Sequence, residues 1–180
     1  MIKKLILLFI PIILFGCKQK EDKSISNENS TSIKKVFNQD EIINIDNLAY
    51  YKKDSTLING ELKIWHENGE IRELKTFKDG KLDGVRKIWF DNGQLMQEGK
   101  YNNGKTNGTR TIWYDTGQLR TIGTYSNNKL NGSFKSWYTN GLLKNEMNYK
   151  NGRVDGVLKL YDEEGNLKEE RIYKDGNKIK

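Results

Sequence analysis

The feature that most constrains this chain is a 24-residue repeat that continues without insertion from residue 59 to the end. Glycine marks three positions of the repeat. The first set is Gly60, Gly84, Gly108, Gly132 and Gly156, and the second is Gly69, Gly93, Gly117, Gly141 and Gly165. The third set is Gly80, Gly104, Gly152 and Gly176, with Asn128 in the missing place. These sets define five full copies, and residues 51–60 look like a further half copy, so we expect the array to begin near Leu48.

Three columns of apolar side chains accompany the glycines. They are Trp65, Trp89, Trp113, Trp137 and Tyr161; Ile71, Leu95, Leu119, Leu143 and Leu167; and Phe77, Tyr101, Tyr125, Tyr149 and Tyr173. A unit of this size cannot bury its apolar side alone, so neighbouring copies must stack. We expect the columns to form ladders along one face and take the two aromatic columns as a candidate binding ladder. Whether the Trp65 and Phe77 columns share that face depends on turn register, because a one-residue slip reverses a side chain.

Each copy is predicted to be a β-hairpin. Asn-Gly pairs end at Gly60, Gly69, Gly93, Gly104, Gly108, Gly132, Gly141 and Gly152, and Asp-Gly pairs end at Gly80, Gly84, Gly156 and Gly176. Both pairs favour the type I′ turn, which needs positive φ at its two central residues. The intervening runs have strand length, and the only proline is Pro11. The predicted fold is therefore all-β: an elongated single-layer antiparallel meander of hairpins, with five full copies and a partial N-terminal one.

The N-terminus is predicted to be an export and lipidation signal. Lys3 and Lys4 precede an apolar stretch at residues 5–15, as in a secretory signal peptide. That stretch is too short to span a bilayer as a helix. Leu14-Phe15-Gly16-Cys17 resembles a bacterial lipoprotein lipobox, which implies that residues 1–16 are removed and that Cys17 carries a diacylglycerol and an N-acyl chain such as palmitate. Acylation with more than one chain would anchor the protein in a membrane.

The residues after Cys17 are predicted to form a flexible tether over 17–47. Lys18 to Ser32 is rich in Ser and Asn and has Ile25 as its one aliphatic residue, so it cannot offset the entropy of ordering. Residues 33–47 are ambiguous: Asp40 could cap a short helix, but β-branched residues dominate and no long period emerges, so no element is assigned there. The repeat domain is assigned to residues 48–180. Lys18 to Asp22 is similar to the export signal of Bacteroidetes surface lipoproteins, which favours the outer membrane and leaves both periplasmic and surface display open.

The repeat itself resembles a known family. The pattern in Gly84 to Gly104, Gly-x4-Trp-x3-Gly-x-Leu-x5-Tyr-x2-Gly, is similar to the MORN-repeat variant of the bacterial YwqK-family antitoxins, and the resemblance covers residues 59–180. MORN arrays are β-hairpin meanders implicated in protein interaction. The resemblance implies a non-enzymatic interaction module.

The chemistry-bearing residues indicate no catalytic or metal site. His66 is the only histidine, and its equivalents are Phe90, Tyr114, Tyr138 and Asp162, so we interpret it as a substitution within a ladder. Cys17 is the only cysteine, which excludes an intramolecular disulfide and leaves no second thiol for a zinc site. Acidic residues recur at Glu67, Asp91, Asp115 and Glu163, where we expect turn chemistry rather than calcium binding. No cofactor is expected.

The net charge of +7 raises the question of nucleic acid. Lysines and apolar residues interleave along the strands, as in Lys87-Ile88-Trp89. However, Lys63, Lys87, Lys135 and Lys159 recur at one position of the repeat, and we interpret this column as the solvated face of a strand. An envelope location makes nucleic acid a poor partner, and none is expected.

Two functions from different classes remain open. The first is a membrane-anchored scaffold that binds a protein partner, including an immunity-type role against a toxin. The alternative is a module that binds carbohydrate or envelope glycan, since exposed Trp and Tyr stack on sugar rings. In either case we expect specificity to lie in the columns that vary between copies, such as the His66 column, or Arg86 and Arg110 against Leu62 and Phe134.

Overall fold

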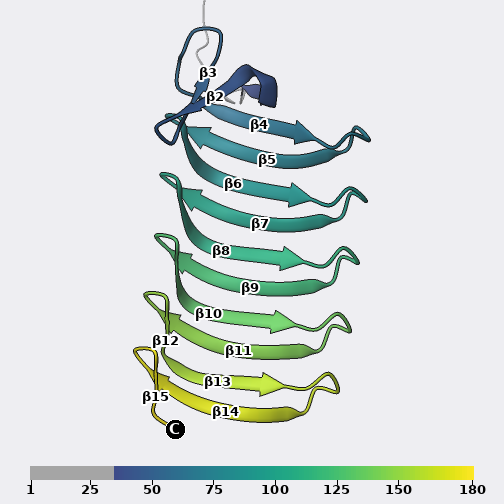
Figure 1. Ribbon diagram of the computed structural model, residues 1–180, viewed down its shortest axis with the longest axis vertical. Helices are drawn as coiled ribbons and strands as arrows, with labels where there is room; N and C mark the ends of the chain where they lie inside the picture. Colours follow the sequence, from purple (N-terminus) through teal and green to yellow (C-terminus); the bar gives the residue numbers. More distant parts are fainter. Residues whose placement is uncertain (1–34) are drawn as a thin grey trace, which may run out of the picture. The chain divides into compact units, whose positions relative to one another are not determined.

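The computed structural model describes residues 35–180 (Figure 1). The predicted signal peptide, Cys17 and residues 18–34 of the predicted tether lie outside the described residues. Between residues 35 and 180, no helix has both the length and the apolar character needed to cross a bilayer.

The described residues form one long sheet and a short two-stranded one. The elements of the N-terminal part are β1 (Val36–Asn38), the 3-10 helix η1 (Gln39–Glu41), β2 (Ile42–Ile45) and β3 (Leu48–Tyr51). The repeats contribute β4 (Gly60–Trp65), β5 (Ile71–Lys78), β6 (Lys81–Trp89), β7 (Leu95–Asn102), β8 (Lys105–Trp113), β9 (Leu119–Ser126), β10 (Lys129–Trp137), β11 (Leu143–Lys150), β12 (Arg153–Val154), β13 (Gly156–Tyr161), β14 (Leu167–Lys174) and β15 (Asn177–Lys178).

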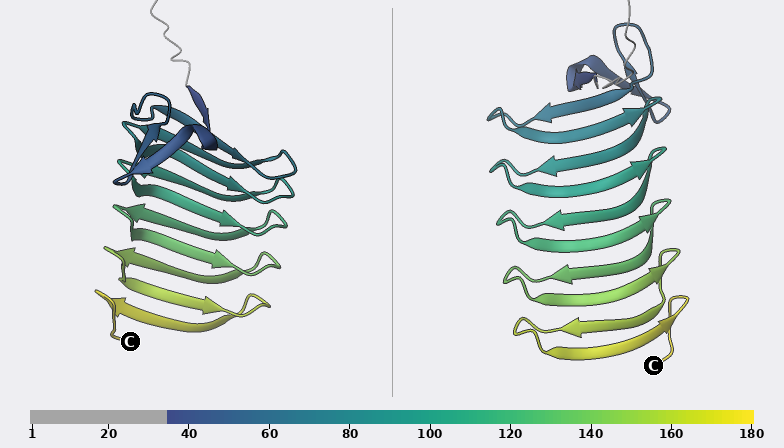
Figure 2. Two further views of the ribbon diagram at one scale, coloured as in Figure 1. Left: turned by 45° about the horizontal axis from the view of Figure 1, so that its top comes forward. Right: turned by 180° about the vertical axis from the view of Figure 1, so that it is seen from behind.

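The long sheet has 13 strands, and from β4 onward its strands pair with their neighbours in chain order, except that β12 and β13 both pair with β11 (Figures 1 and 2). All of these pairings are antiparallel, and only β1 joins the sheet in parallel, beside β4. The prediction of a single-layer antiparallel meander of hairpins is therefore confirmed. Each 24-residue step adds two strands to the growing edge.

Two of the three glycine sets form the hairpin turns. Asp79-Gly80, Asn103-Gly104, Asn127-Asn128, Asn151-Gly152 and Asp175-Gly176 have positive φ at both residues, which confirms the predicted type I′ geometry. At the other end of the strands only the glycine has positive φ, as at Gly69 (φ 87°). There the Gly69 N–H donates to the His66 carbonyl and the His66 N–H to the Glu70 carbonyl, which closes a longer turn than type I′.

The first glycine set does not form turns, so that part of the sequence prediction is wrong. Gly60, Gly84, Gly108, Gly132 and Gly156 lie within or at the start of strands with φ between 108° and 143°. The ladder shifts register beside them, as between Lys75 and Phe77 opposite β6. A Cβ on Gly84 would lie 3.1 Å from the Thr76 Cβ, so glycine permits both the positive φ and a close strand contact. The strands bend where they leave the type I′ turns (Figure 1).

Strand register separates the two aromatic columns. Gly84 pairs with Tyr101, Arg86 with Gly99 and Ile88 with Gln97, so these residues share one face, which we call the tyrosine face. Trp89 follows Ile88 directly and therefore points to the other face, the tryptophan face.

Contacts confirm this assignment. The hydroxyl of Tyr161, in the Trp column, donates to Glu146 Oε1 at 3.2 Å, and Glu146 lies opposite Lys135 on the tryptophan face. The expectation that all apolar columns follow one face is wrong. The Ile88 and Trp columns occupy adjacent positions of the strand, and adjacent residues of a strand point to opposite faces. The Leu column meets Trp across a bulge, as in the pair Trp89 and Leu95.

The N-terminal part folds as a cap on the first hairpin. Its buried core consists of Phe37, Ile42, Ala49, Ile58, Leu62 and Ile64, with Tyr51 and Phe77 packed against it. Residues 36–45, which the sequence analysis placed in the tether, instead form β1, η1 and β2. The cause is tertiary: Phe37 and Ile42 become apolar contacts for a sheet edge that residues 33–47 alone could not reveal.

The expected half copy follows the repeat only at its end. The Gly80 N–H donates to the Ile58 carbonyl as the Gly104 N–H donates to that of Leu82, so Ile58 takes the position of Leu82. Upstream, β3 pairs with β2 instead of joining the long sheet.

Side chains at the longer turns bond each copy to the next. The Tyr114 hydroxyl donates to the Trp137 carbonyl at 2.9 Å, and the Tyr138 hydroxyl to the Tyr161 carbonyl at 2.8 Å. His66 Nε2 lies 3.1 Å from the Trp89 carbonyl in the same arrangement. Asn68, Asn92 and Asn140 add a second set of bonds, each to the carbonyl of the residue 23 positions on. The Phe90 ring has no polar atom with which to make the equivalent bond.

The cap core predicts a large effect of truncation at Ile58, which is 0% exposed. We expect Ile58→Ala to lower the free energy of unfolding by about 2–5 kcal/mol, because it opens a cavity that the sheet edge cannot refill. Chemical denaturation measures the change. Ile45→Ala removes the same atoms from a 50% exposed site of the cap and should cost much less; equal losses would contradict the assigned core.

The copy-to-copy bonds predict a gain of stability at Phe90. Phe90→Tyr should add the missing hydroxyl bond, to the Trp113 carbonyl, and raise the free energy of unfolding by about 0.5–1.5 kcal/mol. Tyr114→Phe, which removes an existing bond, should lower it by a similar amount. Thermal unfolding of both variants tests the pair, and a destabilising Phe90→Tyr would show that the hydroxyl cannot reach the carbonyl.

Candidate functional site

The tryptophan face combines half-buried aromatic rings with paired charges. Trp65 is 44% exposed, while Trp89, Trp113 and Trp137 are half-buried. Lys87 Nζ lies 3.1 Å from Glu98, and Lys135 Nζ lies 3.2 Å from Glu146. Lys87 and Lys135, expected to be simply solvated, are thus half-buried and face carboxylates, which offset their positive charges.

The Tyr161 hydroxyl belongs to the same face. Burial raises its pKa above the usual value, and the nearby Glu146 carboxylate adds to this rise. The phenol therefore stays neutral and serves as a donor to Glu146. The arrangement is that of a surface that offers hydrogen bonds and ring faces.

The His66 column lies at the longer turns and contributes to structure. Arg120 lies 5.6 Å from the centre of the Tyr114 ring, and Lys144 lies 5.2 Å from that of Tyr138, so a cation six residues on covers each ring. His66 takes the same place as these tyrosines, which fits its interpretation as a substitution within a ladder.

The acidic turn column also lies at this edge of the sheet. The backbone carbonyls of Asp91, Asp115 and Glu163 accept the amide bonds from the preceding copy. Among residues 35–180, no three His, Cys, Asp or Glu side chains gather closely enough to hold a metal ion.

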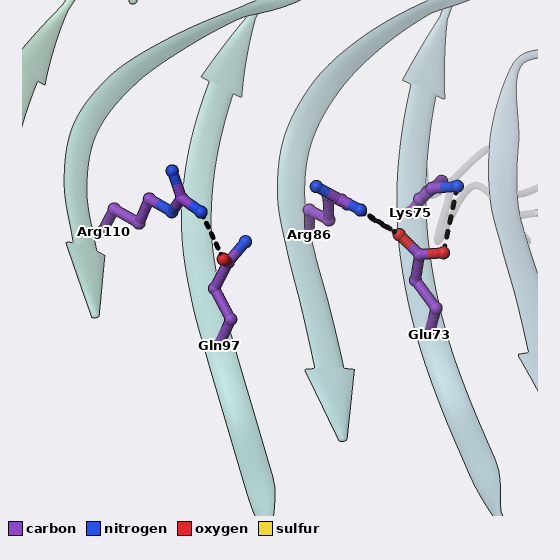
Figure 3. A network of polar contacts seen from close by, with 5 residues as sticks. All are labelled: Glu73, Lys75, Arg86, Gln97 and Arg110. Carbon is purple, nitrogen blue, oxygen red and sulfur yellow. Dashed lines mark hydrogen bonds and ion pairs between the residues drawn. The ribbon is translucent and has the colours of Figure 1, made fainter. Parts of the chain in front are cut away.

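The tyrosine face carries a polar network in place of an apolar layer (Figure 3). Glu73 is only 8% exposed and accepts two cations: Arg86 Nε at 2.7 Å and Lys75 Nζ at 3.0 Å. Burial disfavours the charged form of Arg86, but hydrogen bonds to Tyr101 and Glu73 outweigh it, so the pKa of Arg86 lies above its usual value. This Arg86 and Glu73 pair is internally satisfied.

One copy further on, the same positions hold Arg110 and Gln97 (Figure 3). Arg110 Nη2 donates to Gln97 Oε1. Gln97 is 6% exposed, yet its Nε2 has no partner, and neither has the buried Nε of Arg110. A buried donor without an acceptor costs about 1–3 kcal/mol, so this arrangement is destabilising compared with that of the preceding copy.

Only half of this network was predicted from the sequence. Arg86 and Arg110 were expected to form a variable column with Leu62 and Phe134, but the facing column was not predicted. That column reads Glu73, Gln97, Thr121, Asn145 and Glu169, and its variation between acids and neutral side chains was the available signal. Cys17, the predicted lipidation site, lies outside the described residues.

Comparisons with known proteins complete the description. A comparison with curated protein sequences finds no match. Among solved structures, the chain matches one chain of a crystal structure of the GtfA/B complex bound to UDP and GlcNAc, with 18% identity and a TM-score of 0.27. That match covers 76% of this chain but only 24% of the other.

A protein-family model provides the decisive match. The model of the MORN repeat variant matches five segments, at residues 58–79, 82–103, 106–127, 130–151 and 154–175. They follow the five hairpins of the long sheet and together cover more than half of the chain. The chain therefore belongs to the MORN repeat variant family.

Proposed function

We propose that this chain is a non-enzymatic interaction module, anchored in the bacterial cell envelope by lipid on Cys17, whose repeat sheet binds a protein partner. The family supports a repeat-based interaction module. The lipobox resemblance at residues 14–17 supports the anchor, and the similarity to YwqK-family antitoxins supports an immunity-type role in which the partner is a toxin.

The observation that carries the proposal is that both faces of the repeat sheet are uncovered. All six buried apolar residues found between residues 35 and 180 belong to the cap and the first strand of the repeats. From residue 66 onward, no aromatic side chain in the described sheet is buried, although each copy carries several. A sheet normally buries at least one face against a second layer. Aromatic and arginine side chains on an open surface are also the groups that contribute most to protein interfaces.

Variants on opposite faces test the proposal. The full-length protein, purified in detergent and immobilised, would capture partners from envelope extract. Trp89→Ala with Trp113→Ala alters the tryptophan face, and Tyr101→Ala with Tyr125→Ala alters the tyrosine face. We expect one pair to reduce capture of a specific protein at least tenfold, because buried aromatic anchors each contribute more than about 1.4 kcal/mol.

The two pairs also serve as controls for each other, provided that both variants retain the strand signal in circular dichroism. Wild-type recovery with both pairs would contradict protein binding through the sheet. If no protein partner is captured and the chain binds a glycan array in a way that depends on Trp89 and Trp113, the proposal of protein binding would be replaced by that of carbohydrate binding.

The lipid anchor predicts a separate outcome at Cys17. Cys17→Ser should release the protein from the membrane fraction and abolish incorporation of labelled palmitate, because the thiol that carries the diacylglycerol is gone. Cell fractionation measures both. Ser24→Ala, a change of similar size in the same segment, should leave retention unaltered; normal retention of Cys17→Ser would rule out the lipoprotein assignment.

A further inference from the structure

Arg110 occupies an open position on the tyrosine face. It pairs in register with Gly99 on β7 and with Gly123 on β9, so neither neighbouring strand places a side chain beside it. A Cβ on Gly99 would lie 3.6 Å from Arg110 Cγ, which shows that the arginine stem lies across the space that glycine leaves. Arg110 as a whole is half-buried, so the site is at the surface.

The charge of Arg110 has no internal partner. In the preceding copy, Glu73 accepts both Arg86 and Lys75, but Gln97 replaces the glutamate that would face Arg110. Within residues 35–180, no carboxylate lies within ion-pair distance of Arg110. The tyrosine face therefore carries three cations around one acid in this region: Lys75, Arg86 and Arg110 against Glu73. On the tryptophan face, Lys87 lies within ion-pair distance of Glu98, and Lys135 and Lys159 both lie within ion-pair distance of Glu146.

The unpaired atoms at this position are both donors. Gln97 is more than nine-tenths buried, its Oε1 is used by Arg110, and its Nε2 is free. The Arg110 Nε is likewise buried and free. An unused donor is stabilised by an acceptor, and a charged acceptor makes the stronger bonds. Both donor atoms are covered from solvent, so an external acceptor reaches them only if the Arg110 and Gln97 side chains turn toward the surface. Tyr101 and Tyr125 lie against the two flanking glycines.

We propose that Gln97 and Arg110 bind a carboxylate, and that the protein partner presents an acidic side chain at this point of the tyrosine face. The inference rests on the proposed function, because it assigns chemistry to the partner. The chain contains its own example of the contact: the Glu73 carboxylate bonds Arg86 through Nε at 2.7 Å and Nη2 at 2.6 Å. A partner carboxylate would supply to Arg110 what Glu73 supplies to Arg86.

The charge of the site favours a carboxylate over a phosphate. One guanidinium and one neutral amide provide a single positive charge at the contact itself, and the other surplus charge of the region is shared by Lys75 and Arg86 on Glu73. A phosphate monoester carries about −1.5 to −2 at pH 7 and would remain partly uncompensated in a half-buried site. Arg86 is held by Glu73 and does not supply the second charge.

A fluorescein-labelled hexaglutamate peptide tests the proposal on the full-length protein in detergent, with binding followed by fluorescence anisotropy. Arg110→Met keeps the length of the side chain and removes its charge, and we expect at least a tenfold rise in Kd. Gln97→Glu places an internal carboxylate against Arg110. It should therefore weaken peptide binding at least tenfold while raising Tm by about 2–4 °C.

The opposite responses of binding and stability in Gln97→Glu separate loss of the site from loss of the fold. Lys135→Met removes one positive charge from the tryptophan face and should leave Kd within about twofold, which controls for net charge. Glu73→Gln releases Arg86 and should retain or tighten binding.

Equal affinity of the wild type and Arg110→Met for the peptide would overturn the proposal, because Arg110 would then contribute nothing to carboxylate binding. Displacement of the peptide by inorganic phosphate at the concentration at which glutarate displaces it would also overturn the carboxylate assignment. Either of these negative peptide results would leave the proposed function standing if the protein still captured its partner, because capture is measured independently of the peptide.

Discussion

The structure depends on strand-to-strand hydrogen bonding, because a single-layer sheet has no second layer to hold its strands. Every copy uses backbone ladders on both sides, and side chains reinforce them at the turns. The bonds from Tyr114, Tyr138 and His66 reach carbonyls in the next copy, so each unit is completed by its neighbour. This is the nearest-neighbour stability expected of a repeat array. It also explains why polar side chains, rather than a thick core, dominate the composition.

The cap provides what the repeats lack. A sheet edge exposes unpaired backbone groups and invites association, and at the N-terminal edge β1 occupies it in parallel with β4. Phe37 and Ile58 then bury apolar surface that no repeat copy could bury alone. At the other end, β15 covers only the last part of β14, through Tyr173 and Lys174. The two ends of the array are thus closed to different extents.

The open faces explain why the sheet suits recognition. Equivalent positions can change residue type without changing the backbone, because the hydrogen-bond ladder holds each copy in the same register. Glu73 and Gln97 illustrate this: the same site in successive copies holds a satisfied ion pair or a cation with free donors. The cost of those free donors is tolerable when the surrounding ladder is stable. Variation of this kind can place specific chemistry at chosen points along an otherwise repetitive surface.

Sequence alone determined the repeat period and the hairpins, and Asn-Gly and Asp-Gly pairs marked the type I′ turns at one of the three glycine sets. It identified Arg86 and Arg110 as variable positions, since equivalent residues can be compared within one chain. Only the tertiary structure decided that Gly84 bends a strand, that Trp89 and Tyr101 lie on opposite faces, and that Phe37 caps the sheet. It alone brought Gln97 against Arg110. These outcomes depend on register and on contacts between distant residues, where a shift of one position reverses a side chain.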